Sequence, residues 1–113
     1  MKKIEAYIKS HRLDCVTAAL RQVQGLTGLT VTPARGFGRG HQGTEIHPTQ
    51  EMVHDLHAVV RLEVFCCDEL VQEITKVIQV TSHTGLRGDG KIYVLPVEQA
   101  IRISSSEEGP LAV

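Results

Sequence analysis

The chain has 113 residues, of which 42 % are hydrophobic and only 4 % aromatic, and its formal net charge is −1 at pH 7. This length predicts a single domain over residues 1–113 with an aliphatic core. The near-neutral charge argues against non-specific nucleic-acid binding, which usually needs a strongly basic face. No apolar run approaches the ~20 residues of a membrane span, and no signal peptide precedes the first predicted strand. We therefore expect a cytoplasmic protein that does not insert into membranes.

The first third of the chain passes from strand to helix and back to strand. Apolar residues alternate over residues 4–8, the period of a half-buried strand. From Leu13 to Val23 the apolar spacing changes to three and four, which predicts a helix that Gly25 ends. Strand character returns at residues 30–32.

The remainder begins with a long loop, expected at about residues 37–57, where no clear period is present. A loop of this length inside a compact domain is usually functional or disordered. Apolar residues alternate again over 60–66, a third strand, and Asp68 is a suitable N-cap for a second amphipathic helix. Residues 92–95 are expected to form the fourth strand, and about 104–113 a flexible C-terminal tail.

This order of elements, strand–helix–strand repeated on either side of a long loop, predicts an α+β fold of the ferredoxin-like βαββαβ type. Both helices then cover one face of the sheet and leave the other open. Tyr7, Phe65 and Tyr93 give the strands apolar side chains for that second face. Because a small domain gains stability from association, we expect neighbouring subunits to bury it.

Two basic, glycine-rich segments adjoin predicted strands. Gly85, Gly88 and Gly90 precede Lys91, and residues 35–43 read RGFGRGHQG. Backbone N–H groups in such turns can converge on an anion, and a lysine adds a compact positive charge. The lysine-serine/threonine ending of an NTPase P-loop is absent. The two segments are interpreted as halves of one anion-binding cleft; the alternative is a pair of flexible surface loops.

GFGR at residues 36–39, TG..GDGKI.VLPVE.AIRI at 84–103 and the opening MKKIEAYIK...LD.V..AL resemble the PII signal-transduction family, from residue 1 to about 103. The resemblance implies a homotrimer whose projecting long loop, the T-loop, contacts a target protein. It also implies adenine nucleotides (ADP, AMP or ATP) as ligands in clefts between subunits. The residues that match the family's nucleotide contacts are Thr30, Gly36, Gly38, Arg39, Val64, Gly88, Asp89, Gly90, Lys91 and Arg102.

Four positions depart from the family pattern. Gly40 stands where a glutamine usually helps to hold magnesium, and Val59 stands where a lysine grips a 2-oxoglutarate carboxylate. Met52 replaces the tyrosine that is uridylylated, and Ser104 replaces a second arginine. These departures predict no 2-oxoglutarate sensing, no uridylylation and a weaker hold on a γ-phosphate, so that ADP or AMP is at least as suitable a partner as ATP.

The departures make the chain similar to divergent PII-like members associated with carboxysomes or bicarbonate transporters. We expect a regulator of a transporter or enzyme in inorganic-carbon metabolism, with a small anion such as bicarbonate bound near Gly40, His41 and Arg61. One alternative is a PII-type nitrogen regulator that responds to ATP and ADP.

Two further alternatives are kept. A slow ATPase would have to use Asp89, the sole acid near the glycine-rich turn, and a metal-binding trimer would use His54 and His57. We expect no enzyme, no catalytic cofactor and no metal site, because neither a general base nor a cysteine or carboxylate ligand set accompanies these residues.

Overall fold

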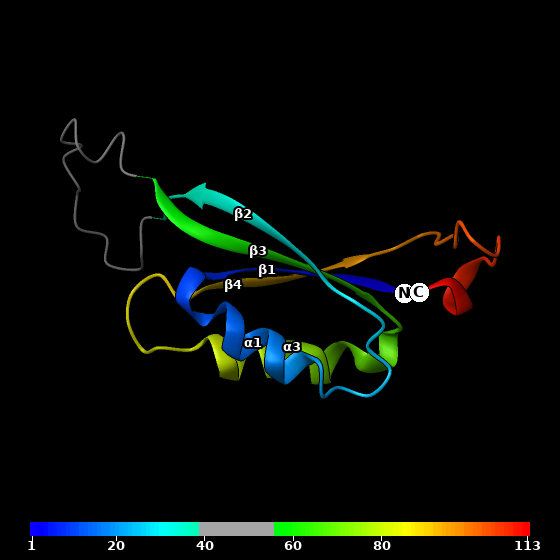
Figure 1. The fold of residues 1–113 in the computed structure, drawn as a ribbon, viewed down its shortest axis with the longest axis horizontal. Helices are drawn as coiled ribbons and strands as arrows, with labels where there is room; N and C mark the ends of the chain where they lie inside the picture. The colour runs from blue at the N-terminus through cyan, green and yellow to red at the C-terminus, as the bar shows by residue number, and fades with distance from the viewer. Residues whose placement is uncertain (39–55) are drawn as a thin grey trace.

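The structure is a computed structural model that describes residues 1–38 and 56–113. Its strands are β1 (Lys2–Lys9), β2 (Thr30–Gly36), β3 (His57–Cys66) and β4 (Gly90–Pro96), and its helices are α1 (Leu13–Leu20) and α3 (Val71–Ser82). Short 3-10 helices lie at Ser10–Arg12, Asp68–Leu70 and Gly109–Ala112. The four strands form one sheet in the order β2-β3-β1-β4, with every neighbouring pair antiparallel. Both helices cover the same face of it (Figure 1), so the predicted ferredoxin-like α+β fold is confirmed.

The core lies between this face and the helices. Ile4 on β1 is paired with Val64 on β3 and with Val94 on β4. Because side chains of paired residues point to the same side of a sheet, these three residues share a face. Burying such an aliphatic side chain contributes about 1.5–3 kcal/mol. The buried cluster is aliphatic except for one cysteine and consists of Ile4, Ala6, Ile8, Val16, Leu20, Val23, Val60, Leu62, Val64, Cys66, Ile74 and Ile78.

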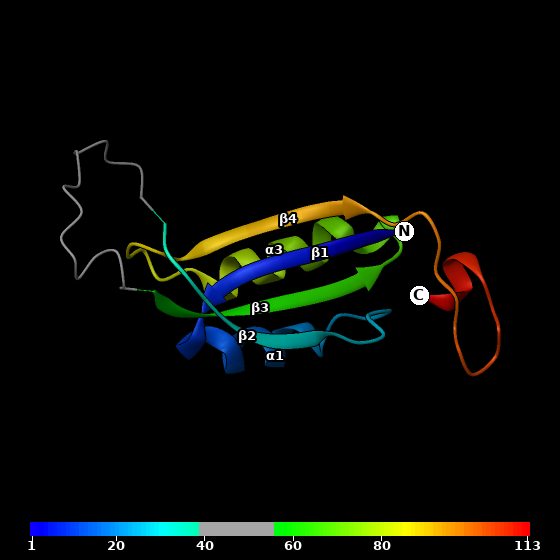
Figure 2. The ribbon, with the colours of Figure 1, turned by 90° about the horizontal axis from the view of Figure 1, so that it is seen from above.

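The opposite face of the sheet is open, and Figure 2 looks onto it. Phe65 is 46 % exposed there and Tyr93 is 49 % exposed. The rings of Tyr7 and Tyr93 meet edge-to-face with their centroids 6.3 Å apart. The expected apolar side chains therefore do lie uncovered in the protomer.

Several element boundaries differ from the sequence-based expectation. Helix α1 ends at Leu20 and does not continue to Val23. The second strand continues past residue 32 to Gly36 and includes Pro33, which is tolerated because β2 is an edge strand. Asp68 is not the N-cap of α3, which begins at Val71 with no side-chain cap hydrogen bond. The Asp68 carboxylate instead accepts a hydrogen bond from the Met1 ammonium at 2.8 Å, which lowers the pKa of Asp68.

The C-terminal segment, expected to be a loose tail, folds back on itself. Ile101 and Glu108 form an isolated β-bridge, and the Arg102 amide donates to the Glu107 carbonyl at 2.8 Å. Ser106 adopts a φ of +61°, which closes this turn. Backbone hydrogen bonds, which a run of serines and glutamates does not reveal, account for the difference.

Among the described helices, none has the length and apolar character that crossing a bilayer requires.

Candidate functional site

The glycine-rich turn between α3 and β4 is organised around the carboxylate of Asp89. One carboxylate oxygen accepts hydrogen bonds from the backbone amides of Thr84 at 2.9 Å and Gly85 at 3.1 Å. The other accepts one from the Thr84 hydroxyl. Gly85, Gly88 and Gly90 all have positive φ, as the sequence predicts. Hydrogen bonds among its own residues therefore shape the turn.

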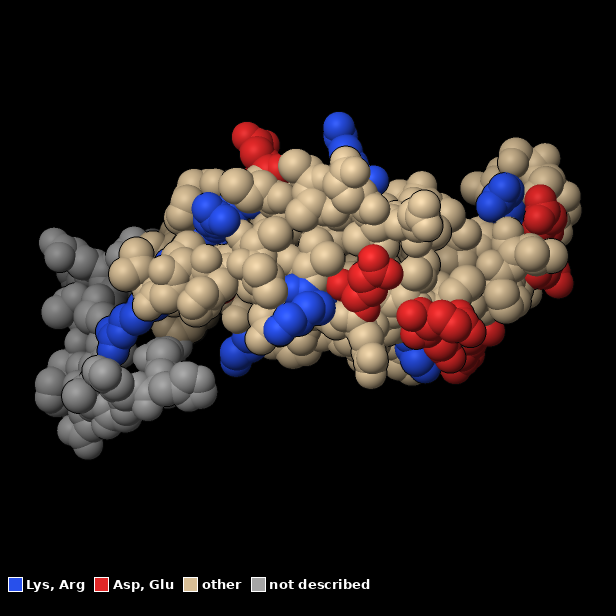
Figure 3. Space-filling model, turned by 90° about the horizontal axis from the view of Figure 1, so that it is seen from below, with Lys and Arg blue, Asp and Glu red and all other residues tan. Residues whose placement is uncertain are grey.

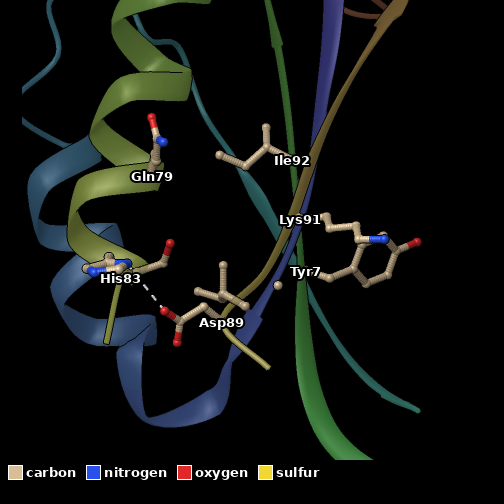
Figure 4. A pocket seen from close by; sticks show the side chains of 9 residues that line it. Tyr7, Gln79, His83, Asp89, Lys91 and Ile92 are labelled. Atoms are coloured by element: carbon tan, nitrogen blue, oxygen red, sulfur yellow. Dashed lines mark ion pairs between the residues drawn. The ribbon is translucent and has the colours of Figure 1, made fainter. Parts of the chain in front are cut away.

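Two basic side chains also approach Asp89. Lys9 Nζ lies 3.2 Å from Asp89 Oδ1, and His83 Nδ1 lies 3.4 Å from Asp89 Oδ2 (Figure 4). The hydrogen bond from the Thr84 hydroxyl, followed by the bond from the Thr84 amide, holds the pKa of Asp89 far below its usual range. A carboxylate with this many hydrogen-bond and ion-pair partners is a structural anchor and a poor proton acceptor.

Lys91 follows the turn, and its side chain points away from His83. Figure 4 shows the Lys91 and Tyr7 side chains on one side of the strands and Gln79 and His83 on the other. Lys91 is exposed, and it takes part in none of the ion pairs among residues 1–38 and 56–113. Its charge is thus available to an anion bound beside the turn.

A cavity of about 410 Å³ lies between α3 and β4, on the helix-covered side of the turn. Its lining combines polar groups of α3 with the turn and the adjoining strands: Tyr7, Ile8, Gln79, Ser82, His83, Asp89, Gly90, Lys91 and Ile92. The Ser82 hydroxyl is already bound to the Ile78 carbonyl at 2.6 Å.

The described part of the other glycine-rich segment, residues 35–38, lies at the same end of the sheet but at its opposite edge. Gly36 ends β2 and is paired with His57, whereas Gly90 begins β4. Three strand spacings separate β2 from β4, roughly 14 Å. Gly38 is described and exposed, and Arg39 lies outside the described residues. Within the described residues, one protomer therefore keeps Gly36 and Gly38 apart from the turn that precedes β4.

Thr30 and Arg102 are also far from the turn at 83–90. Thr30 begins β2 opposite Glu63, and Arg102 lies in the C-terminal segment at the other end of the molecule (Figure 1, orange and red). The Arg102 guanidinium donates to the Leu111 carbonyl at 3.3 Å. Among the expected nucleotide contacts that the structure describes, Gly88, Asp89, Gly90 and Lys91 lie together at this turn, and Thr30, Gly36, Gly38 and Arg102 lie elsewhere.

The Val64 side chain is buried in the protomer. It is 1 % exposed and belongs to the core beneath the helices. Because side chains alternate along a strand, its neighbour Phe65 is the one that reaches the open face. The alternation of apolar residues over 60–66 already indicates that the Val64 side chain is buried, and its expected contact with a nucleotide stays a prediction.

The residues expected to hold a small anion are only partly described. Gly40 and His41 lie outside the described residues. Arg61 lies on the open face, where its Nε is 3.1 Å from Glu63 Oε1 in an ion pair that lacks hydrogen-bond geometry. Lys3 Nζ also binds this carboxylate, at 3.2 Å. The charge of Arg61 is therefore already balanced within the sheet.

Metal ligands are not gathered in the described part of the chain, which contains no group of three or more histidine, cysteine or acidic side chains. His54 and Met52 lie outside that part, so the pairing of His54 with His57 stays untested. Figure 3 shows positive and negative side chains interspersed over the described part of the helix-covered face, without one extended basic patch.

The fold and the turn define a class: a ferredoxin-like α+β protein with a glycine-rich turn before its last strand. The family model described as "Nitrogen regulatory protein P-II" matches residues 1–107. The chain belongs to this PII family, as the sequence motifs indicate.

Relatives are similar over the whole length. The P-II nitrogen regulatory proteins of Azospirillum brasilense and Rhodospirillum rubrum are 48 % and 46 % identical over 113 residues, all of this chain and all of each relative. A crystal structure of Arabidopsis thaliana PII bound to citrate superposes with a TM-score of 0.81 at 32 % identity. That comparison covers 99 % of this chain and 91 % of the plant chain.

Proposed function

We propose that this chain is a cytoplasmic PII signalling protein that assembles as a homotrimer, binds an adenine nucleotide in the clefts between subunits and controls a target protein through its T-loop. One observation carries the proposal. The candidate contacts at Gly36 and Gly38, at residues 88–91 and at Arg102 occupy three separate places on the protomer. Only neighbouring copies can bring such groups to one ligand.

The chemistry of the turn suits a phosphate group. Lys91 is exposed beside glycines that leave the backbone accessible. Arg102 can offer a second cation from another copy, because a guanidinium forms two parallel hydrogen bonds with phosphate oxygens. Ser104, in place of a second arginine, removes one cationic contact, and such a contact is worth about 1.5–3 kcal/mol. ADP or AMP is therefore proposed to bind at least as well as ATP.

Regulation is favoured over ATP hydrolysis by the state of Asp89. Its carboxylate is bound by the Thr84 hydroxyl and amide, the Gly85 amide and Lys9, and its pKa is far below the usual range. General bases work best with a pKa near the operating pH. In a regulator, the nucleotide needs only a different affinity for two states of the T-loop.

Two pathways are candidates for the target. Nitrogen regulation is supported by the names of the full-length relatives. Inorganic-carbon metabolism, with bicarbonate as the second ligand, is supported by Val59, which cannot form an ion pair with a dicarboxylate. The ion pair between Arg61 and Glu63 removes one cation from the bicarbonate proposal, so the nitrogen pathway has the stronger support.

Calorimetry with ADP, AMP and Mg-ATP tests the proposal on the wild-type chain and on Lys91→Ala. We expect binding to the wild type and at least about tenfold weaker binding to the variant, since a charge-assisted contact is lost. Lys76→Ala, at an exposed position on α3, is the matched control. Absence of nucleotide binding to the wild type, or equal affinity in Lys91→Ala, would refute the proposal.

The second ligand is tested by titrating 2-oxoglutarate and bicarbonate separately into the nucleotide-saturated protein. We expect 2-oxoglutarate to leave nucleotide affinity unchanged, and Val59→Lys to introduce a response to it. A wild-type response to 2-oxoglutarate contradicts the role given to Val59. A response to bicarbonate selects the carbon pathway.

A further inference from the structure

We infer that Lys9 and Thr84 are positioning residues, which hold Asp89 and thereby keep the glycine-rich turn in the shape and charge state that accepts an anionic ligand. The inference deepens the proposed function and rests on it. Both residues stand in the family motifs at 1–9 and 84–103, but neither was among the expected nucleotide contacts. Both act through Asp89, whose side chain is itself only 24 % exposed.

The Thr84 hydroxyl uses its full hydrogen-bonding capacity inside the turn. It donates its proton to Asp89, and its oxygen accepts from Lys9 Nζ at 3.1 Å and from the Leu86 amide at 3.1 Å. A hydroxyl offers one donor and two lone pairs, so no capacity remains for a ligand. Thr84 therefore orders the turn from within.

Lys9 connects this turn to the sheet. It is the last residue of β1, the strand that pairs with both β3 and β4. Its ammonium binds Asp89 at 3.2 Å, and its stem passes beneath Gly88, where a Cβ would lie 3.8 Å from Lys9 Cε. The Lys9 side chain is 20 % exposed, so solvent screens the contact only partly. Lys9 thus holds the turn in place relative to β1, which is an inner strand of the sheet.

The charge of Lys9 has a second consequence. An unpaired carboxylate at Asp89, directly before Gly90 and Lys91, would repel a phosphate group and compete for the Lys91 ammonium. Pairing with Lys9 removes most of that repulsion, because the electric fields of two opposite charges in contact largely cancel each other further away. Lys9 thereby makes an acidic residue compatible with an anion-binding turn.

Substitution in matched pairs tests both roles. Lys9→Met and Thr84→Val remove the charge and the hydroxyl at nearly constant volume, whereas Lys9→Arg and Thr84→Ser keep them. We expect ADP affinity to fall about tenfold in the first pair, the effect of one charge-assisted hydrogen bond, and to stay within about threefold of wild type in the second. Lys2→Met, the same change at the other end of β1, is the control and should bind ADP as the wild type does.

A second readout needs no ligand. Hydrogen exchange of the Thr84 and Gly85 amides, measured by NMR, should accelerate in Lys9→Met and Thr84→Val and not in Lys2→Met, since both amides are bound to Asp89. Thermal unfolding of each variant separates this local loosening from global destabilisation.

A double variant distinguishes positioning from direct contact between Lys9 and the ligand. If Lys9 neutralises Asp89, then Asp89→Asn should recover part of the ADP affinity lost in Lys9→Met; if Lys9 touches the ligand, nothing is recovered and the inference fails. Unchanged ADP affinity and exchange rates in both Lys9→Met and Thr84→Val also overturn it. A wild-type chain that binds no ADP refutes the proposed function instead, and the exchange rates alone then decide whether Lys9 and Thr84 hold the turn.

Discussion

A Cβ atom added to Gly90 would lie 1.7 Å from the carbonyl oxygen of Tyr7 on the neighbouring strand. Gly90 also has a φ of +106°, a conformation that residues with side chains rarely adopt. It is the first residue of β4 and pairs with Ile8. The close approach of β1 and β4 at this point therefore depends on glycine, whatever role the residue has in binding.

Gly90→Ala should accordingly lower the free energy of unfolding by about 2–4 kcal/mol, combining backbone strain with a steric overlap that the sheet cannot relieve locally. Gly28→Ala is the control, because a Cβ there meets nothing within 4 Å, and its effect should stay within about 0.5 kcal/mol. Urea unfolding followed by circular dichroism measures both. Equal stabilities of the two variants would show that β1 and β4 are more adaptable than this.

The sequence predicts those parts of the fold that depend on local residue patterns, and it misses those that depend on distant partners. Alternation over 4–8 and 60–66 and the apolar spacing of the helices depend on nearest neighbours and on burial, so these elements are found correctly. The end of β2 at Gly36 is not, because its pairing with His57 joins residues separated by the long loop. Strand length here is decided by a distant partner.

The candidate site shows the same division. The glycines at 85, 88 and 90 have positive φ as predicted, since that requirement is local. The hydrogen bonds from Thr84 and Gly85 to Asp89 are local, but the ion pair of Asp89 with Lys9, 80 positions earlier in the chain, could not be predicted from the sequence. Matching a motif also does not say which face of a strand a side chain occupies: the Val64 side chain lies in the core, and its expected role in binding stays a prediction.

The open face contains two carboxylates that face each other, Glu5 on β1 and Glu63 on β3. Lys3 compensates them, with its ammonium 3.1 Å from Glu5 and 3.2 Å from Glu63. The hydrogen bond from the Tyr7 hydroxyl, followed by that from Lys3, holds the pKa of Glu5 below its ordinary value. A group with a depressed folded-state pKa stabilises the protein above its unfolded pKa and loses that effect as pH falls through the folded value.

Lys3→Met should therefore destabilise the protein at pH 7 and much less near pH 3, where protonated carboxylates no longer repel each other. The destabilising effect of Lys3→Met should begin to decline below pH ~4.3, the ordinary pKa of glutamate. Lys76→Met on α3 serves as the control. Urea midpoints at both pH values test the expectation, and a loss of equal size at pH 3 and pH 7 would indicate that Lys3 acts through packing of its stem.

Helix α3 allows burial to be tested with two closely spaced residues. Ile78 is fully buried, and Val80 is 59 % exposed. Ile78→Ala should cost about 2–5 kcal/mol because it leaves a cavity against the sheet. Val80→Ala should be neutral or stabilising by a few tenths of a kcal/mol, because alanine has the higher helix propensity. Thermal or urea unfolding checks both, and a large loss in Val80→Ala would mean that another surface covers this side of α3.

Assembly through the open face gives the last prediction. Phe65 is 46 % exposed on that face and lies opposite Lys3. Phe65→Asp places a carboxylate beside this ammonium, so the isolated protomer should tolerate the change. If neighbouring copies cover the face, however, each copy buries a charge at an apolar contact, which costs on the order of several kcal/mol.

Light scattering after size-exclusion chromatography should then show the wild type near three times the mass of one 12.4 kDa chain and Phe65→Asp near the mass of a single chain, with an unchanged circular dichroism spectrum. Val80→Asp, on the helix-covered side, should keep the wild-type mass. A trimer that survives Phe65→Asp but dissociates with Val80→Asp would place the contact on the helices. The three parts of the proposed nucleotide site would then have to meet through a different arrangement of subunits.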